Sequence, residues 1–164
     1  MTKFVGLSFL LASVAGSLFG AGDSFPPGVY KSASELMATL AKSAETRPDM
    51  ASAPVSNQDH YRINVVRRSS PGAAMAHASG PAKGSELHYI IDGSATVVTG
   101  GKLVPIPGAP ATKGANRFTI EGGETRHVAK GDVIVIPAGT PHWYKEVQGS
   151  VTYLEVRFDV ELNK

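Results

Sequence analysis

Residues 131–146 constrain the fold of this chain more than any other segment, because they predict two strands joined by one tight turn. The first strand is a run of β-branched residues, which favour a packed sheet: Val133, Ile134, Val135 and Ile136. Pro137 cannot donate a ladder hydrogen bond and ends this strand, and Gly139 supplies the backbone angles of the turn. His142 opens the second strand, with Tyr144 on the same face. A histidine held beside a rigid turn suits a metal ligand.

The amino-acid composition limits the chemistry of any such site. The chain has no cysteine, which excludes disulfides and thiolate metal sites. A metal site must therefore use histidine and carboxylate ligands, a set that suits Mn, Fe, Co, Ni, Cu or Zn. The 164 residues predict one domain. With 16 basic and 14 acidic residues the chain is almost neutral, which gives no electrostatic support for binding nucleic acid.

The first 22 residues resemble a secretory signal peptide. Lys3 precedes an apolar run over residues 4–19, and small residues at 20–22 suit a cleavage site. The run is short for a membrane span, which needs roughly 20 apolar residues; an uncleaved N-terminal anchor is the alternative. We therefore expect a periplasmic or secreted protein that leaves the membrane once residues 1–22 are removed.

Residues 23–57 are predicted to form a helix followed by a linker. Ser32 and Glu35 make a capping box. Apolar residues then recur on one face, which predicts an amphipathic helix over residues 33–45. Two prolines within residues 46–57 predict the linker.

The remainder of the chain, residues 58–164, is predicted to be a β domain. Alternating or β-branched patterns predict strands at residues 61–65, 72–77, 87–91, 95–99, 117–120, 125–129, 132–136, 142–147 and 151–158. Asp92 and Gly93 predict a tight hairpin, and residues 102–116 predict a surface loop. Many short strands separated by glycine and proline are typical of an all-β sandwich or barrel. The long apolar runs fit a double-sheet jelly roll.

The spacing within residues 131–146 resembles the second signature motif of the cupin superfamily. That motif is Gly, five residues, Pro, one residue, Gly, two residues, His, three residues, Asn. The chain matches it at Gly131, Pro137, Gly139 and His142, and has Glu146 in the last place. The resemblance implies an all-β fold: a single double-stranded β-helix, or jelly-roll barrel, with a short N-terminal helix.

The first cupin motif is matched only at its end. Glu86 and Gly93 have the required six residues between them, but the paired histidines that should precede Glu86 are replaced by residues that cannot bind a metal. The nearest upstream histidine is His77. His88 lies two residues beyond Glu86, so both side chains leave the same face of one strand.

Four side chains are therefore predicted to converge: His77, Glu86, His88 and His142. Three imidazoles and one carboxylate are a common cupin ligand set, and the resemblance implies a divalent ion, one of Fe, Mn, Zn, Ni or Cu. Such a set leaves coordination positions open for water or substrate. The alternative is a cupin without metal, in which His142 only lines the mouth of the barrel.

The resemblance leads to a first hypothesis of an exported metalloenzyme of the oxygenase, isomerase or lyase type. The ion acts as a Lewis acid or oxygen-binding centre, and Glu86 is a ligand or a catalytic base. A second hypothesis is a non-catalytic cupin that binds a sugar or another small polar ligand, and a third is a purely structural metal. The expected partner is a small molecule, and the apolar strands are compatible with a homodimer.

Several other polar residues are not assigned to the predicted site. Tyr153, Glu155 and Arg157 alternate on the last predicted strand, and their pattern fits a barrel lining, a cross-strand pair or a dimer interface. The adjacent Arg67 and Arg68 are explained by a solvated strand end. Two histidines are left out of the predicted site, His60 at the surface and His127 on another strand.

Overall fold

The computed structural model describes residues 26–69, 75–78, 84–107 and 118–159, and of residues 75–78 it describes the backbone alone. The predicted signal peptide at residues 1–22 and most of the predicted loop at 102–116 lie outside these ranges. Within them, no helix is long and apolar enough to cross a membrane.

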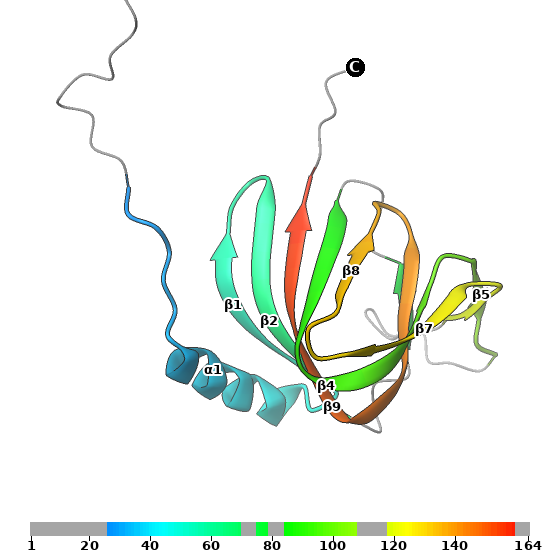
Figure 1. Ribbon diagram of the computed structural model, residues 1–164, viewed down its shortest axis with the longest axis horizontal. Helices are drawn as coiled ribbons and strands as arrows, with labels where there is room; N and C mark the ends of the chain where they lie inside the picture. The colour runs from blue at the N-terminus through cyan, green and yellow to red at the C-terminus, as the bar shows by residue number, and fades with distance from the viewer. Residues whose placement is uncertain (1–25, 70–74, 79–83, 108–117, 160–164) are drawn as a thin grey trace, which may run out of the picture.

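The described chain consists of one helix and nine strands (Figure 1). The elements are α1 (Ala33–Thr46), β1 (Met50–Asn57), β2 (Tyr61–Ser69), β3 (Met75–Ala78), β4 (Ser85–Thr99), β5 (Lys102–Pro105), β6 (Phe118–Glu121), β7 (Glu124–Ala129), β8 (Val133–Ile136) and β9 (Pro141–Phe158). All strand pairs are antiparallel. Hydrogen-bonded neighbours run in the order β1-β2-β9-β3-β6-β5, and β4 joins β9 to β7 and β8. This is the expected jelly-roll barrel.

Helix α1 lies outside the barrel, beside β1 and β2 (Figure 1). The predicted capping box is confirmed: the Ser32 hydroxyl accepts a hydrogen bond from the Glu35 amide, and the Glu35 carboxylate accepts one from the Ser32 amide. Leu40 is fully buried in a cluster with Ala51, Ala53 and Val65. This apolar contact fixes the helix on the sheet.

Strands β4 and β9 are long and bent, and they build both halves of the barrel (Figure 1). They pair along their whole length, from Ser85 opposite Phe158 to Thr99 opposite His142, with irregularities around Gly93. The predicted hairpin at Asp92 and Gly93 is therefore wrong. Gly93 has φ of 78° and its backbone lies so close to Ser150 that a Cβ atom would be 2.0 Å from the Ser150 carbonyl oxygen. The glycine bends a continuous strand at a bulge.

Two segments predicted to be irregular belong to the sheet. The linker predicted over residues 46–57 is wrong from Met50 onward, because Met50–Asn57 is β1. In the described chain β1 pairs with β2 alone, so Pro54 sits on an edge strand, where a missing amide is tolerated. The loop predicted over residues 102–116 likewise begins with an edge strand, β5.

The two faces of the β2-β9-β4 sheet differ sharply in polarity. One cross-strand row contains Asn64, Glu155 and His88, and the neighbouring row on the same face contains Arg62, Arg157 and Glu86. The alternate residues form apolar rows on the other face. Polar side chains therefore point into the barrel at this end. They adjoin a buried core cluster made of Val66, Ile90, Ala95, Val97, Val128, Tyr144, Val151 and Tyr153.

Candidate metal centre

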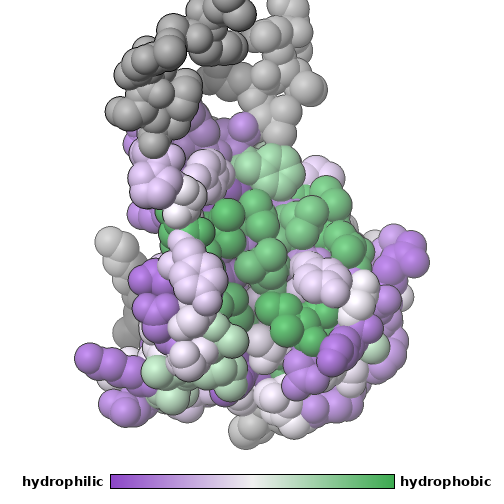
Figure 2. Space-filling model, turned by 60° about the vertical axis from the view of Figure 1, so that its left-hand side comes forward, coloured by the Kyte–Doolittle hydropathy of each residue, from purple (hydrophilic) through white to green (hydrophobic). Residues whose placement is uncertain are grey.

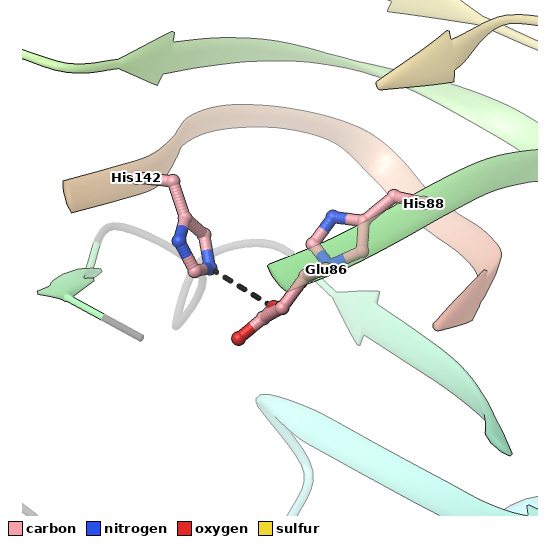
Figure 3. Close-up of side chains that lie close together, drawn as sticks. All are labelled: Glu86, His88 and His142. Carbon is pink, nitrogen blue, oxygen red and sulfur yellow. Dashed lines mark hydrogen bonds and ion pairs between the residues drawn. The ribbon is translucent and has the colours of Figure 1, made fainter. Parts of the chain in front are cut away.

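Three potential metal-binding side chains converge inside the barrel: Glu86 and His88 from the start of β4, and His142 from the start of β9 (Figure 3). Their ligand atoms all lie within 4.8 Å of one another, and the three residues are 0–1% exposed. Because β4 and β9 are antiparallel, their first residues lie at opposite ends of the shared ladder. The curvature of the barrel brings those ends together.

Both histidines direct Nε2 toward one carboxylate oxygen (Figure 3). Glu86 Oε2 is 3.1 Å from His88 Nε2 and 3.7 Å from His142 Nε2. The two imidazole rings are 5.7 Å apart between centroids and nearly perpendicular. Two imidazoles and one carboxylate at this spacing fit a divalent transition-metal ion and leave part of its coordination shell for water or substrate.

Tyr144 contacts the second ring nitrogen of His88. The Tyr144 hydroxyl is 3.0 Å from His88 Nδ1. When His88 binds an ion through Nε2, the proton is on Nδ1 and is donated to the Tyr144 oxygen, which fixes the tautomer and the ring orientation. The sequence placed Tyr144 on the face of His142, as the structure shows, but gave no sign of its contact with His88.

The surroundings of Glu86 keep its carboxylate ionised. Burial raises the pKa of Glu86, but the hydrogen bond with His88 and the charges of His142 and Arg157 outweigh it, and the pKa falls to about 2. An ionised carboxylate is a good metal ligand. A group with such a low pKa is a weak base at neutral pH, because an efficient general base has a pKa near the working pH.

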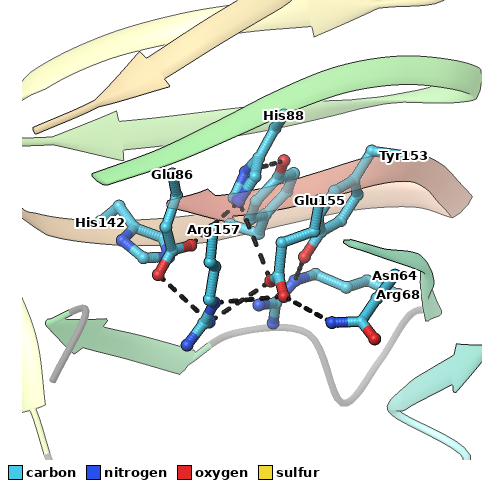
Figure 4. A network of polar contacts seen from close by, with 9 residues as sticks. Asn64, Arg68, Glu86, His88, His142, Tyr153, Glu155 and Arg157 are labelled. Atoms are coloured by element: carbon cyan, nitrogen blue, oxygen red, sulfur yellow. Dashed lines mark hydrogen bonds and ion pairs between the residues drawn. The ribbon is translucent and has the colours of Figure 1, made fainter. Parts of the chain in front are cut away.

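A polar network flanks the three potential ligands (Figure 4). Arg157 Nη2 is 3.1 Å from Glu86 Oε1, and Arg157 Nε is 3.2 Å from Glu155 Oε1. Glu155 also accepts a 3.2 Å hydrogen bond from Asn64, and its other oxygen is 4.0 Å from His88 Nε2. The sequence left three placements open for Glu155 and Arg157: a barrel lining, a cross-strand pair or a dimer interface. The structure places both in the barrel lining, where they also pair with each other.

Arg68 lies beside this network and contacts two tyrosines, Tyr144 and Tyr153. It is 5% exposed, so the solvated strand end expected for it is wrong. Its Nε donates a 2.9 Å hydrogen bond to the Tyr153 hydroxyl, and its guanidinium lies 4.8 Å from the centre of the Tyr144 ring. The two tyrosine rings stack at 5.0 Å. Alternation with Asn64 along one strand was the available sequence signal for an inward Arg68.

The remaining histidines fall into two groups. His77 lies in β3 directly opposite His142 of β9. Its side chain is outside what the structure describes, so its role as a ligand stays a prediction. His60 and His127 are both exposed, in agreement with their omission from the predicted site.

Histidine and carboxylate donors on the inner face of an antiparallel jelly roll are typical of one class of β-barrel protein. A family model described as Cupin matches residues 50–157, well over half of the chain. The chain therefore belongs to the cupin family, as its motif spacing predicted.

Several solved structures are similar to this chain at low sequence identity. KdgF from Halomonas sp. is 14% identical, with a TM-score of 0.49, over 70% of this chain and 82% of that one. Hydroxypropylphosphonic acid epoxidase from S. wedmorenis is 14% identical, with a TM-score of 0.50, over 67% and 51% of the two chains. The Cnp3 cupin domain of Schizosaccharomyces pombe is 14% identical, with a TM-score of 0.49, over 68% and 66%.

At these identities the likeness concerns the fold alone. This chain spans about half the length of the epoxidase. No curated protein matches it.

Proposed function

We propose that this cupin is a small-molecule metalloenzyme in which Glu86, His88 and His142 hold one divalent ion, from among Fe, Mn, Zn, Ni and Cu. The observation that carries the proposal is the convergence of three buried donor groups within 4.8 Å. Arg157 contacts Oε1 of Glu86, and the oxygen that faces the two imidazole nitrogens is Oε2, where a bound cation would contact all three donor groups.

Each residue around the proposed ion has a distinct task. Glu86 is the anionic ligand, and its pKa of about 2 favours this task over that of a catalytic base. Tyr144 orients His88 through its hydrogen bond to Nδ1. The bound ion supplies Lewis-acid polarisation of a substrate oxygen or a binding site for oxygen, as required by an isomerase, a lyase or an oxygenase.

Two further parts of the proposal rest on the sequence and the backbone. His77 is proposed as a fourth ligand, and its place opposite His142 in the β3–β9 ladder is compatible with that role. Export to the periplasm or the medium is proposed from the signal-like residues 1–22.

Metal analysis of the full chain purified without a polyhistidine tag tests the proposal. We expect one divalent ion per chain by elemental analysis, or on titrating metal-stripped protein with Mn²⁺, Fe²⁺ or Zn²⁺. Binding should raise the unfolding free energy, by about 2.7 kcal/mol at an ion concentration 100 times Kd. A chain that binds none of these ions contradicts the proposal. An ion bound with no exchangeable water and no turnover indicates the structural alternative.

A further inference from the structure

Arg157 differs from the proposed ligands in its access to solvent. Its side chain is 32% exposed, whereas that of Glu86 is 1% exposed. It therefore connects the buried donor groups with the outside of the barrel. Its guanidinium bridges two carboxylates, those of Glu86 and Glu155 (Figure 4).

A second arginine occupies the same level of the sheet. Arg62 of β2 lies directly opposite Arg157 of β9, so both side chains leave the same face, and Arg62 is exposed. Like charges in directly opposite positions destabilise a sheet. Two guanidinium groups that leave the same face of a sheet at directly opposite positions are stabilised when an anion lies between them.

The formal charges of the buried network also favour an anionic ligand. Without a metal, the two carboxylates Glu86 and Glu155 are balanced by the two guanidiniums Arg68 and Arg157. A divalent ion held with neutral imidazoles adds two positive charges to this network. A buried excess of charge is costly, so the metal-loaded site favours a ligand that is itself an anion.

We propose that Arg157, with Arg62 beside it, binds the carboxylate of an organic-acid substrate. A further oxygen atom of the same substrate molecule then reaches the ion. This inference rests on the proposed metal site. Arg157 already contacts both oxygens of Glu155, through Nε at 3.2 Å and Nη2 at 3.3 Å, so its orientation suits a carboxylate. Both histidines face Oε2 of Glu86, whereas Arg157 Nη2 lies 3.1 Å from Oε1, so Arg157 would stay beside an ion held by Oε2.

Binding of lactate and of its neutral analogue lactamide to the Mn²⁺-loaded chain tests this assignment. Elemental analysis first establishes the metal content, and calorimetry then gives the affinities. We expect lactate to bind at least tenfold more tightly than lactamide. The Arg157→Gln variant should lose this preference and keep its Mn²⁺, and Arg62→Gln should weaken lactate binding to a smaller degree. Arg126→Gln is the matched control, because Arg126 also pairs with a glutamate two residues earlier, Glu124, but on an exposed strand.

Equal binding of lactate and lactamide, or full lactate affinity in Arg157→Gln, overturns the carboxylate site and leaves the metal site standing. Tighter binding of inorganic phosphate than of lactate overturns the substrate class. A wild-type chain that holds no metal overturns the proposed function itself, and this outcome is recognised before any organic acid is added. Arg157→Lys keeps the charge without the planar fork and should retain part of the lactate affinity.

A different observation concerns the outside of the same sheet. Figure 2 shows a broad hydrophobic surface on one side of the molecule. Two cross-strand rows of apolar residues run over the outer face of β2, β9, β4 and β8: Ile63, Val156, Leu87 and Val135 in one, and Val65, Leu154, Tyr89 and Val133 in the other. Val133 is 57% exposed and Val135 is 60% exposed. An antiparallel sheet with one free face normally turns its polar side outward.

Helix α1 packs on the end of this face near Val65 and Leu154, and within the described residues the β4–β8 end is not covered by the helix.

Discussion

The His142→Ala variant is expected to lose its divalent ion, with a fall in affinity of more than about 100-fold, which exceeds the effect of removing an outer partner of a ligand. The reason is geometric. His142 is the one described ligand that comes from β9, so without it the ion is held by two residues of a single strand. Glu86→Gln should be comparably severe, because it removes the negative charge of the set. Titration of metal-stripped protein with Zn²⁺ or Mn²⁺ measures both effects.

Graded variants separate direct coordination from general damage to the barrel. Tyr144→Phe removes only the hydrogen bond to His88 Nδ1 and should cost about 10–100-fold in affinity. His77→Ala should weaken binding if the proposed fourth ligand is correct. His127→Ala removes an exposed histidine and should leave the affinity unchanged. Retention of a full metal complement by His142→Ala is incompatible with the proposed site.

Sequence periodicity predicted the local parts of this site. Glu86 and His88 were expected on one face because they lie two residues apart in a strand, and the structure places both inside the barrel. The glycine-proline turn before His142 predicted a strand that begins with this histidine, and β9 begins at Pro141. Both inferences depend on a few neighbouring residues, and this is why they were correct.

The contacts that depend on bending and long-range register were not predictable in the same way. A glycine with positive φ occurs both in tight hairpins and in bulges, so Asp92 and Gly93 could not reveal that β4 continues. For Arg157 the sequence left a barrel lining, a cross-strand pair and a dimer interface open, and for Arg68 alternation with Asn64 was a signal only once Asn64 was known to face inward. The pairing of β9 with β2 and β4 decides which face of the sheet points into the barrel. The proline in β1 was likewise ambiguous between a linker and an edge strand.

Acidification is expected to destabilise the metal-free protein through Glu86. The pKa of this carboxyl is about 2 in the folded state, against an ordinary value of 4.5. A group whose pKa is lower in the folded state stabilises the fold at a pH above its unfolded value. That stabilisation is lost as the pH falls from about 4.5 to about 2, because the unfolded chain takes up the proton first. Its size is ~3 kcal/mol, at 1.36 kcal/mol for each pKa unit.

Urea unfolding of metal-stripped wild-type and Glu86→Gln protein between pH 2 and pH 6 measures this contribution directly. Other carboxylates also titrate in this range, so the informative quantity is the difference in unfolding free energy between the two proteins. We expect the wild type to be favoured at pH 6 and the difference to shrink by ~3 kcal/mol at pH 2. The exposed Glu124 serves as the control, since screening by solvent makes its ion pair with Arg126 weak, and Glu124→Gln should follow the wild-type profile. If the difference in unfolding free energy between wild type and Glu86→Gln stays constant with pH, His88 and Arg157 do not hold this carboxylate in its charged form. The ligand role assigned to Glu86 then loses its electrostatic basis.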